Sequence, residues 1–313
     1  MITTFEQVLE HTKEHPVRTL AVAVAEQASV LESVRDALAA DIARPLLFGK
    51  AREIEAQAAE VGLDLSQADV VDQPNDLAAA AQAVLAVREG RADILMKGQI
   101  HTDDFLRALL NKEQGLRTGS IMSHVFILET GFRGKFTFVT DGAMNIAPDL
   151  VTKADIIMNA VFLANCFGIE CPKVGVLAAV ELVDPKMPVT LEAGALGAMA
   201  RRGQFPNCIV DGPFALDNAI DPHAAKVKKI SGEVAGDCDI LVCPDIESGN
   251  ILSKSFAFLC GGKSAGVLVG AAAPVVLTSR ADSAEAKLYS IATAVLMVNL
   301  FRGGRLKIGK IHF

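Results

Sequence analysis

Tryptophan is absent from this 313-residue chain, tyrosine occurs once, and positive charge is scarce, with a net charge of −7. An acidic chain lacks the basic face that sequence-independent nucleic-acid binding requires, although a local basic pocket for an anion remains possible. The abundant small and β-branched residues are typical of a packed α/β protein rather than of a coiled coil or a disordered chain.

Long apolar runs are missing as well. The longest uncharged run, Ser264 to Ser279, is shorter than a membrane span and contains Pro and several Gly, so it predicts buried strands. The amino-terminal segment carries Glu6 and no apolar signal core. We therefore expect a cytoplasmic protein without a nucleic-acid or membrane partner.

The common cofactor motifs are missing too. None of the six cysteines forms a CxxC pair, which argues against a zinc or redox motif and predicts that most are buried thiols in a reducing compartment. The dinucleotide fingerprint GxGxxG and the phosphate loop GxxxxGK[ST] do not occur, so the commonest nucleotide cradles are excluded.

Short apolar runs alternate with helical patterns along the chain. The predicted strands are 19–25, 45–49, 69–71, 93–96, 121–128, 136–139, 174–179, 208–210, 240–243, 275–277 and an edge strand at 306–313. The predicted helices are 4–14, 30–43, 50–62, 75–90, 102–111, 149–168, 191–202, 252–259 and 283–301. This alternation predicts a parallel sheet with helices on both faces, in which ligands bind beyond the carboxyl ends of the strands.

The length favours two domains. A polar, Gly-rich break at 129–135 and a second break at 262–265 place residues 1–130 and 265–313 in a first domain. Residues 131–264 then form an inserted second domain.

One strand end carries the clearest chemical signal. Val275 to Leu277 predict a short buried strand that leads through Thr278, Ser279 and Arg280 into a helix capped by Asp282 or Ser283. A hydroxyl, a guanidinium and unpaired backbone N–H groups at a helix start suit a phosphate. An ordinary turn whose arginine points to water is the alternative.

Four other stretches place polar residues and Gly at strand ends, where such a sheet exposes its working surface. Simple turns stabilised by Asx side chains are the alternative interpretation. The stretches are 96–102, 115–125, 139–148 and 244–250.

Together these stretches resemble the phosphate acetyltransferase/phosphate butyryltransferase family over nearly the whole chain, with detail closer to the butyryltransferase-like branch. The motifs that carry the resemblance are Met96-Lys97-Gly98, Ser123-His124-Val125, Asp141 to Pro148, Pro244 to Asn250 and Thr278-Ser279-Arg280. The resemblance implies a two-domain, three-layer α/β/α fold like that of isocitrate and isopropylmalate dehydrogenases, with the active site in the interdomain cleft. It also implies a homodimer or larger homo-oligomer.

The implied reaction is acyl-CoA + phosphate ⇌ acyl phosphate + CoA, by direct transfer in a ternary complex. Acyl-CoA and phosphate would be the partners, coenzyme A is a substrate, and no metal or redox cofactor is expected. The acyl group would be short, acetyl or butyryl.

The resemblance also implies roles for particular residues. Ser279 would orient the thiol, Arg280 would hold phosphate and stabilise developing charge, and Arg117 would be a second phosphate-binding arginine. The base is open, since the family's aspartate position holds Ala286 here, which leaves Asp282 first and Glu285 second as catalytic candidates. Further predicted substrate- or phosphate-binding residues are Lys97, Ser123, Asp141, Asn145, Glu247 and Asn250.

Two other functions remain as alternatives. A metal-dependent 2-hydroxyacid dehydrogenase of the same fold would need a carboxylate cluster on a divalent cation. A non-catalytic CoA- or phosphate-binding module would bind CoA without acyl transfer.

Overall fold

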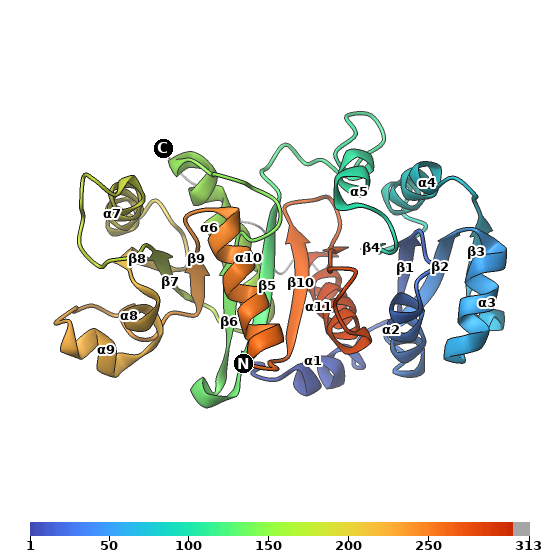
Figure 1. The fold of residues 1–313 in the computed structure, drawn as a ribbon, viewed down its shortest axis with the longest axis horizontal. Coiled ribbons are helices and arrows are strands. Elements are labelled where there is room, and N and C mark those ends of the chain that lie inside the picture. The colour runs from blue at the N-terminus through green and yellow to red at the C-terminus, as the bar shows by residue number, and fades with distance from the viewer. Residues whose placement is uncertain (303–313) are drawn as a thin grey trace. The chain divides into compact units, whose positions relative to one another are not determined.

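The computed structural model describes residues 1–302 (Figure 1). Contacts along the chain divide it into two compact units. We call them the N/C unit, residues 5–120 with 265–302, and the middle unit, residues 1–4 with 121–264. The domain boundaries inferred from the sequence, after residues 130 and 264, remain a prediction.

The sheet of the N/C unit has the strand order β3-β2-β1-β4-β11-β10. Strands β1, β2, β3, β4 and β11 pair in parallel, as the alternation of strands and helices predicts, whereas β10 is antiparallel to β11. The all-parallel prediction is therefore wrong at β10, because the turn before β11 is too short for a crossover helix. The bounds are β1 Arg18–Ala23, β2 Ala43–Gly49, β3 Asp69–Asp72, β4 Ile94–Lys97, β10 Ser264–Val269 and β11 Val275–Val276.

The helices of the N/C unit follow local capping signals. Asn75 accepts the backbone N–H of Ala78 and begins one helix, while Gly62, in the left-handed conformation at φ 73°, ends another. The bounds are α1 Phe5–Thr12, α2 Ala28–Ala39, α3 Ala51–Val61, α4 Asp76–Arg88, α5 Thr102–Leu109 and α11 Ala284–Arg302, with a 3₁₀ turn at Leu65–Gln67.

The middle unit has the strand order β5-β6-β9-β7-β8. Strands β5 and β6 form an antiparallel hairpin, which the parallel-sheet prediction missed, and β6, β9, β7 and β8 pair in parallel. The strands are β5 Ser123–Thr130, β6 Lys135–Thr140, β7 Lys173–Leu177, β8 Ile209–Phe214 and β9 Ile240–Val242. The helices are α6 Leu150–Cys166, α7 Pro188–Arg201, α8 Leu216–Ile220, α9 Pro222–Val227 and α10 Ile246–Lys254, with a 3₁₀ turn at Gly131–Arg133 and a π-helical turn at Ser255–Leu259.

Some sequence expectations differ from the structure. The helix expected at 252–259 begins at Ile246, because Asp245 accepts the backbone N–H of Ser248 and caps it earlier. Of the six cysteines, which are all free, three are buried, Cys208 is half-buried, and Cys171 and Cys260 are exposed, so burial is less general than predicted. The predicted edge strand 306–313 lies outside the described residues.

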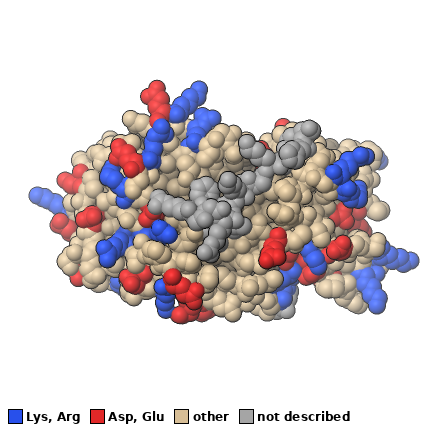
Figure 2. All heavy atoms as spheres, turned by 180° about the vertical axis from the view of Figure 1, so that it is seen from behind, with Lys and Arg blue, Asp and Glu red and all other residues tan. Residues whose placement is uncertain are grey.

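The surface carries charges of both signs. Figure 2 shows Lys and Arg interspersed with Asp and Glu on one face, without a continuous basic area on that face. Within residues 1–302, no helix is both long and apolar enough to cross a membrane.

Candidate active site

The turn after β11 contains Ser279 and Arg280, and we call it the Ser-Arg turn. It is fixed by reciprocal hydrogen bonds between Ser279 and the residues that follow it. Asp282 Oδ2 accepts the backbone N–H of Ser279 at 2.7 Å, and Ser279 Oγ accepts the N–H of Ala281 at 3.3 Å. Ser283 Oγ then accepts the N–H of Ala286 at 3.1 Å, which is the geometry of an N-cap for α11. The Arg280 side chain is exposed. The sequence-predicted hydroxyl and guanidinium therefore stand at the start of the last long helix.

Lys97 ends the neighbouring strand. Strand β4 runs parallel to β11 with Met96 opposite Val276, so Lys97 and the Ser-Arg turn leave the sheet at the same edge. The Lys97 residue is 3% exposed, and Nζ donates only a long hydrogen bond, 3.4 Å, to Gly98 O. Gly98 itself packs so closely that an added Cβ would lie 2.1 Å from Val24 O, hence only glycine fits after Lys97.

A second buried lysine lies beneath the turn. Lys287, on α11, is 1% exposed and its ammonium donates to Asp282 O. Thr278, 8% exposed, has a buried Oγ1 without a partner among the described residues. We call Lys97, Arg280, Asp282 and Lys287 the cationic cluster, since it holds three cationic side chains and one carboxylate.

The cluster alters the acidity of its lysines. Burial, together with the charges of Arg280 and Lys287, lowers the pKa of Lys97 to about 8, and Asp282 opposes this shift. Burial also lowers the pKa of Lys287, against the pull of Asp282 and Glu32. The cluster is thus short of negative charge, which is the condition that favours binding of an anion.

The end of β1 contacts the same turn. Gln27 Nε2 donates to Arg280 O at 2.8 Å, while its Oε1 is buried without a partner among the described residues. Glu26, 7% exposed, accepts the N–H of Lys50 at 2.9 Å, and burial raises the pKa of its carboxyl. Parallel strands β1, β4 and β11 therefore all contribute to this carboxyl edge, where α/β sheets bind their ligands.

Two sequence candidates of the N/C unit are exposed. Glu285 accepts the hydroxyl of Tyr289 at 2.8 Å. Arg117 lies in a loop whose next residue, Thr118, donates to Gly270 O in the turn before β11. The roles of Glu285 as a base and of Arg117 as a second phosphate ligand remain predictions.

In the middle unit, Asp141 organises the loop after β6. It is 2% exposed, and its carboxylate accepts four hydrogen bonds, from the backbone N–H groups of Ala143, Met144 and Asn145 and from Asn145 Nδ2. Asn145 Nδ2 also donates to Met122 O at 2.9 Å. These bonds tie the loop to the chain entering β5, which is a structural role for both predicted site residues.

The other candidates of the middle unit differ in exposure. Ser123 is fully buried, and its Oγ accepts Asn159 Nδ2 at 2.9 Å. Asn250 Nδ2 donates to Gly142 O at 3.0 Å, which links α10 to the Asp141 loop. Glu247 is exposed in the first turn of α10. Of these three, Glu247 has the freest side chain for a substrate, and all three substrate contacts remain predictions.

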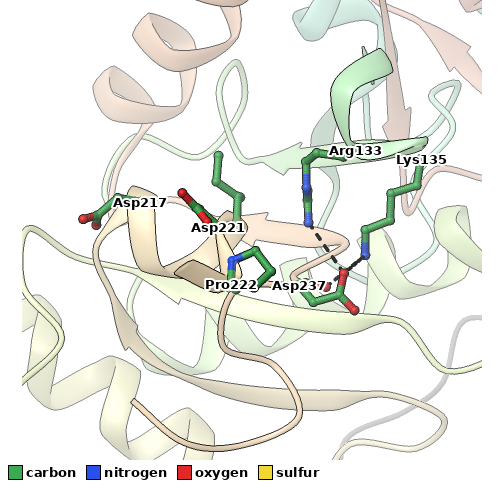
Figure 3. A pocket seen from close by; sticks show the side chains of 8 residues that line it. Arg133, Lys135, Asp217, Asp221, Pro222 and Asp237 are labelled. Carbon is green, nitrogen blue, oxygen red and sulfur yellow. Dashed lines mark hydrogen bonds and ion pairs between the residues drawn. The ribbon is translucent and has the colours of Figure 1, made fainter. Parts of the chain in front are cut away.

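A cavity of about 590 Å³ lies elsewhere in the middle unit (Figure 3). Arg133 and Lys135 point toward Asp237 on its wall, and Lys135 Nζ lies 2.8 Å from that carboxylate. The guanidinium of Arg133 donates to Thr137 Oγ1 and Cys238 O, at 2.8 Å each. Because the cations are already paired, this cavity does not offer the unneutralised charge of the cationic cluster.

Neither a hydrolase site nor a metal site is found among the described residues. Residues 262–266 match Gly-x-Ser-x-Gly, but Ser264 begins strand β10, whereas a hydrolase elbow needs its serine at a strand-to-helix turn. In the part of the chain that the structure describes, no three His, Cys, Asp or Glu side chains gather as metal ligands would.

The model of the phosphate acetyl/butaryl transferase family matches residues 3–81 and 74–295. The chain belongs to this family. It is 47% identical to a phosphate butyryltransferase from Clostridium acetobutylicum, over 95% of this chain and 99% of the relative. It is 45% identical to a phosphate acetyltransferase from Thermotoga maritima, over 89% of this chain and 95% of the relative.

Solved structures show the same fold. A branched-chain phosphotransacylase from Enterococcus faecalis has a TM-score of 0.79 at 35% identity, covering 90% of this chain and 99% of that one. A 4-hydroxythreonine-4-phosphate dehydrogenase from Burkholderia phymatum has a TM-score of 0.52 at 15% identity, covering 90% and 99%, a likeness of fold alone. The predicted family and the dehydrogenase-like α/β fold are thereby confirmed.

Sequence reasoning missed three residues that surround the Ser-Arg turn. The sequence does mark Lys287 as unusual, because a lysine at the apolar spacing of a predicted helix must either reach water or find a polar partner. Glu26 and Gln27 follow a predicted strand directly, but no familiar motif marks them. Only the structure shows that Gln27 reaches Arg280.

Proposed function

We propose that this chain is a phosphate acyltransferase that converts acyl-CoA and phosphate to acyl phosphate and CoA. The observation that carries the proposal is the family match, which spans residues 3–295 and includes the Ser-Arg turn. The cationic cluster supports it, because a phosphate substrate needs a cationic partner that no carboxylate already neutralises. The family match does not favour a metal-dependent dehydrogenase or a non-catalytic module.

The reaction we propose is a direct transfer in a ternary complex. A phosphate oxygen attacks the thioester carbonyl carbon, and the thiolate of CoA leaves with the electrons of the C–S bond. Arg280, exposed beside the start of α11, would hold the phosphate and stabilise the charge that develops on the carbonyl oxygen. Ser279, half-buried at the same turn, would orient the sulfur.

The proposed acyl group is short. The relatives include a phosphate butyryltransferase at 47% identity and a phosphate acetyltransferase at 45% identity, so both chain lengths belong in the assay. The test measures loss of thioester from acetyl-, propionyl-, butyryl- and longer acyl-CoA with and without phosphate. Phosphate-dependent loss with one preferred short chain is the expected result. Thioester loss that ignores phosphate, or none with any chain length, would refute the proposed function.

We further propose that the protein works without a resident cofactor, as a cytoplasmic homodimer or larger homo-oligomer. Three exposed apolar side chains on α10 and the turn after it support self-association: Ile251, 65% exposed, Phe258, 59%, and Leu259, 83%. Burial of such a patch is a common reason for subunits to associate. Light scattering at several protein concentrations would test the assembly, and a monomer throughout would exclude it.

A further inference from the structure

The two carboxylate bases, Asp282 and Glu285, remain predictions, and each already accepts a hydrogen bond within the protein. Asp282 accepts the backbone N–H of Ser279 with one oxygen and sits at the turn as part of its hydrogen-bonding scheme. Glu285 is exposed on the first turn of α11, bonded to Tyr289. An acyl transfer that releases or consumes a thiol still needs a group that exchanges a proton with sulfur.

Lys97 is the side chain of the cationic cluster that is free to exchange a proton. A guanidinium has only donors and does not serve as a proton acceptor in proteins, and the ammonium of Lys287 already donates to Asp282 O. Lys97 Nζ has only its 3.4 Å bond to Gly98 O and makes no carboxylate ion pair within residues 1–302. It leaves the sheet at the same edge as the Ser-Arg turn.

We infer that Lys97 exchanges a proton with the sulfur of CoA and that the charge of the bound phosphate sets its protonation state. This inference rests on the proposed acyl transfer and adds a catalytic residue to it. The groups that face Lys97 are Arg280 and Asp282 from the turn after β11 and Lys287 from α11. In the free protein, burial first and then the two cations oppose an ammonium at Lys97 more than the single carboxylate supports it.

Phosphate binding changes this balance. A dianion placed at Arg280 compensates the positive charge of the cluster, so the ammonium form of Lys97 becomes favourable again. The phosphate complex is therefore the protonated one. Formation of the C–O bond uses the negative charge of one phosphate oxygen, so support for the Lys97 ammonium weakens at the step in which sulfur needs a proton.

A proton passes between Lys97 and the sulfur of CoA in both directions of the reaction. In phosphorolysis, a phosphate oxygen bonds to the carbonyl carbon, the C–S bond breaks, and sulfur takes a proton from the Lys97 ammonium. In the reverse reaction, the neutral Lys97 amine takes the thiol proton and sulfur bonds to the carbonyl carbon. Hydrogen phosphate leaves with the electron pair of the C–O bond, after one phosphoryl oxygen has taken a proton from water, and the Lys97 ammonium returns its proton to water. A thiol with a pKa near 8.5 and an amine of similar pKa exchange a proton without a large penalty.

The first test needs no activity. Isothermal titration of sulfate, a dianion that does not itself titrate near neutral pH, is run at pH 8 in two buffers of different ionisation enthalpy. Uptake of a fraction of a proton per site is expected, because a lysine with a pKa near 8 is only partly protonated before the anion binds. Lys97→Arg keeps the charge but cannot release it, so the uptake should vanish. Equal heats for the wild-type protein in both buffers would overturn the inference even if the variant did not fold.

The second test separates charge from proton exchange. Lys97→Arg should keep the KM for phosphate near the wild-type value and lower kcat by about 10²-fold, the usual range for loss of an acid or base. In the wild type, kcat/KM for phosphate should fall above pH about 8, while that for acyl phosphate should fall below it. Both of these pH-dependent falls in kcat/KM, which we call the pH limbs, should be absent in the Lys97→Arg variant. A Lys97→Arg protein with the wild-type kcat and pH limbs would contradict the inference.

A matched control uses the same substitution at a neighbouring strand end. Lys50 follows β2, and its ammonium lies 3.3 Å from Glu53, outside the cationic cluster. Lys50→Arg should leave proton uptake, kcat and both pH limbs unchanged. Failure of acyl transfer in the wild type would count against the proposed function, whereas sulfate-linked proton uptake tests Lys97 separately.

Discussion

The backbone N–H of Ser279 donates to Asp282 Oδ2 across 2.7 Å, so the residue predicted as the base also holds the serine in place. This bond predicts how two substitutions differ. Asp282→Asn keeps an oxygen acceptor and should retain most of kcat, while Asp282→Ala releases the turn at a cost of about 1 kcal/mol, typical of a lost hydrogen bond. The Ala variant should lose about fivefold in kcat/KM for phosphate, since 1 kcal/mol corresponds to a factor of about five.

Steady-state kinetics of both variants decide between the two roles. A base cannot be replaced by an amide, so an Asp282→Asn protein as slow as the Ala variant would restore Asp282 as the catalytic base.

Arg280 is predicted to matter for the chemical step. Arg280→Ala should lower kcat/KM by ~10²-fold or more, because a guanidinium that stabilises developing charge acts in the transition state. Arg107→Ala is the control, since Arg107 is 71% exposed and pairs only with Asp104 on α5. Initial rates at several phosphate concentrations check the effect. A normal rate for Arg280→Ala would remove Arg280 from the mechanism.

Burial of Lys97 also predicts a pH dependence of stability. Its pKa is about 8 in the folded protein and 10.5 ordinarily, so between these values the unfolded chain binds more protons. The free energy of unfolding that Lys97 contributes must therefore rise as pH increases from about 8 to 10.5. Lys97→Met should be more stable than the wild type at pH 7 and should flatten this rise. Urea unfolding at pH 7, 8, 9 and 10 measures it, and parallel pH profiles for the two proteins would refute it.

The sequence predicts the N/C unit better than the middle unit, for reasons seen in particular residues. Strands β1 to β4 are short apolar runs separated by helices with cap signals such as Asn75 and Gly62, so local pattern and fold agree. The β5–β6 hairpin is closed by Gly131–Arg133 and lacks the two-residue Asn-Gly type of turn that would have announced it. Without that turn signal, the sequence pattern predicts parallel strands at β5 and β6 as well, although the two strands are antiparallel.

Among site residues, the sequence predicts which ones gather at strand ends but not which atoms are free. Ser123 and Asp141 are polar residues at strand ends, the same pattern as Lys97. The structure distinguishes them, because Asp141 is saturated by its own loop and Ser123 by Asn159, while Lys97 keeps one weak bond. Such partners come from residues distant in sequence, and no local pattern encodes them.

We accordingly predict that Asp141 contributes to the free energy of unfolding of the protein. Asp141→Ala removes an acceptor of four hydrogen bonds at a buried site and should lower the free energy of unfolding by about 3 kcal/mol, given 1–3 kcal/mol for each buried donor left unpaired. Asp104→Ala removes an exposed carboxylate of α5 and should change stability by less than about 0.5 kcal/mol. Urea unfolding measures both. Equal stabilities of the two variants would show that the Asp141 loop does not depend on its carboxylate.

The last prediction concerns Arg133, whose side chain is 6% exposed at the wall of the cavity in the middle unit. Arg133→Met fills similar space but leaves Thr137 Oγ1 and Cys238 O without their donor, which should cost about 2–3 kcal/mol of unfolding free energy. Arg201→Met is the control, because Arg201 is 68% exposed and lies 3.7 Å from Asp211. Since Arg133 lines this cavity and is not a member of the cationic cluster, the variant should keep the wild-type kcat at a temperature where it stays folded. A stable Arg133→Met protein with a reduced kcat would instead assign the cavity to the reaction.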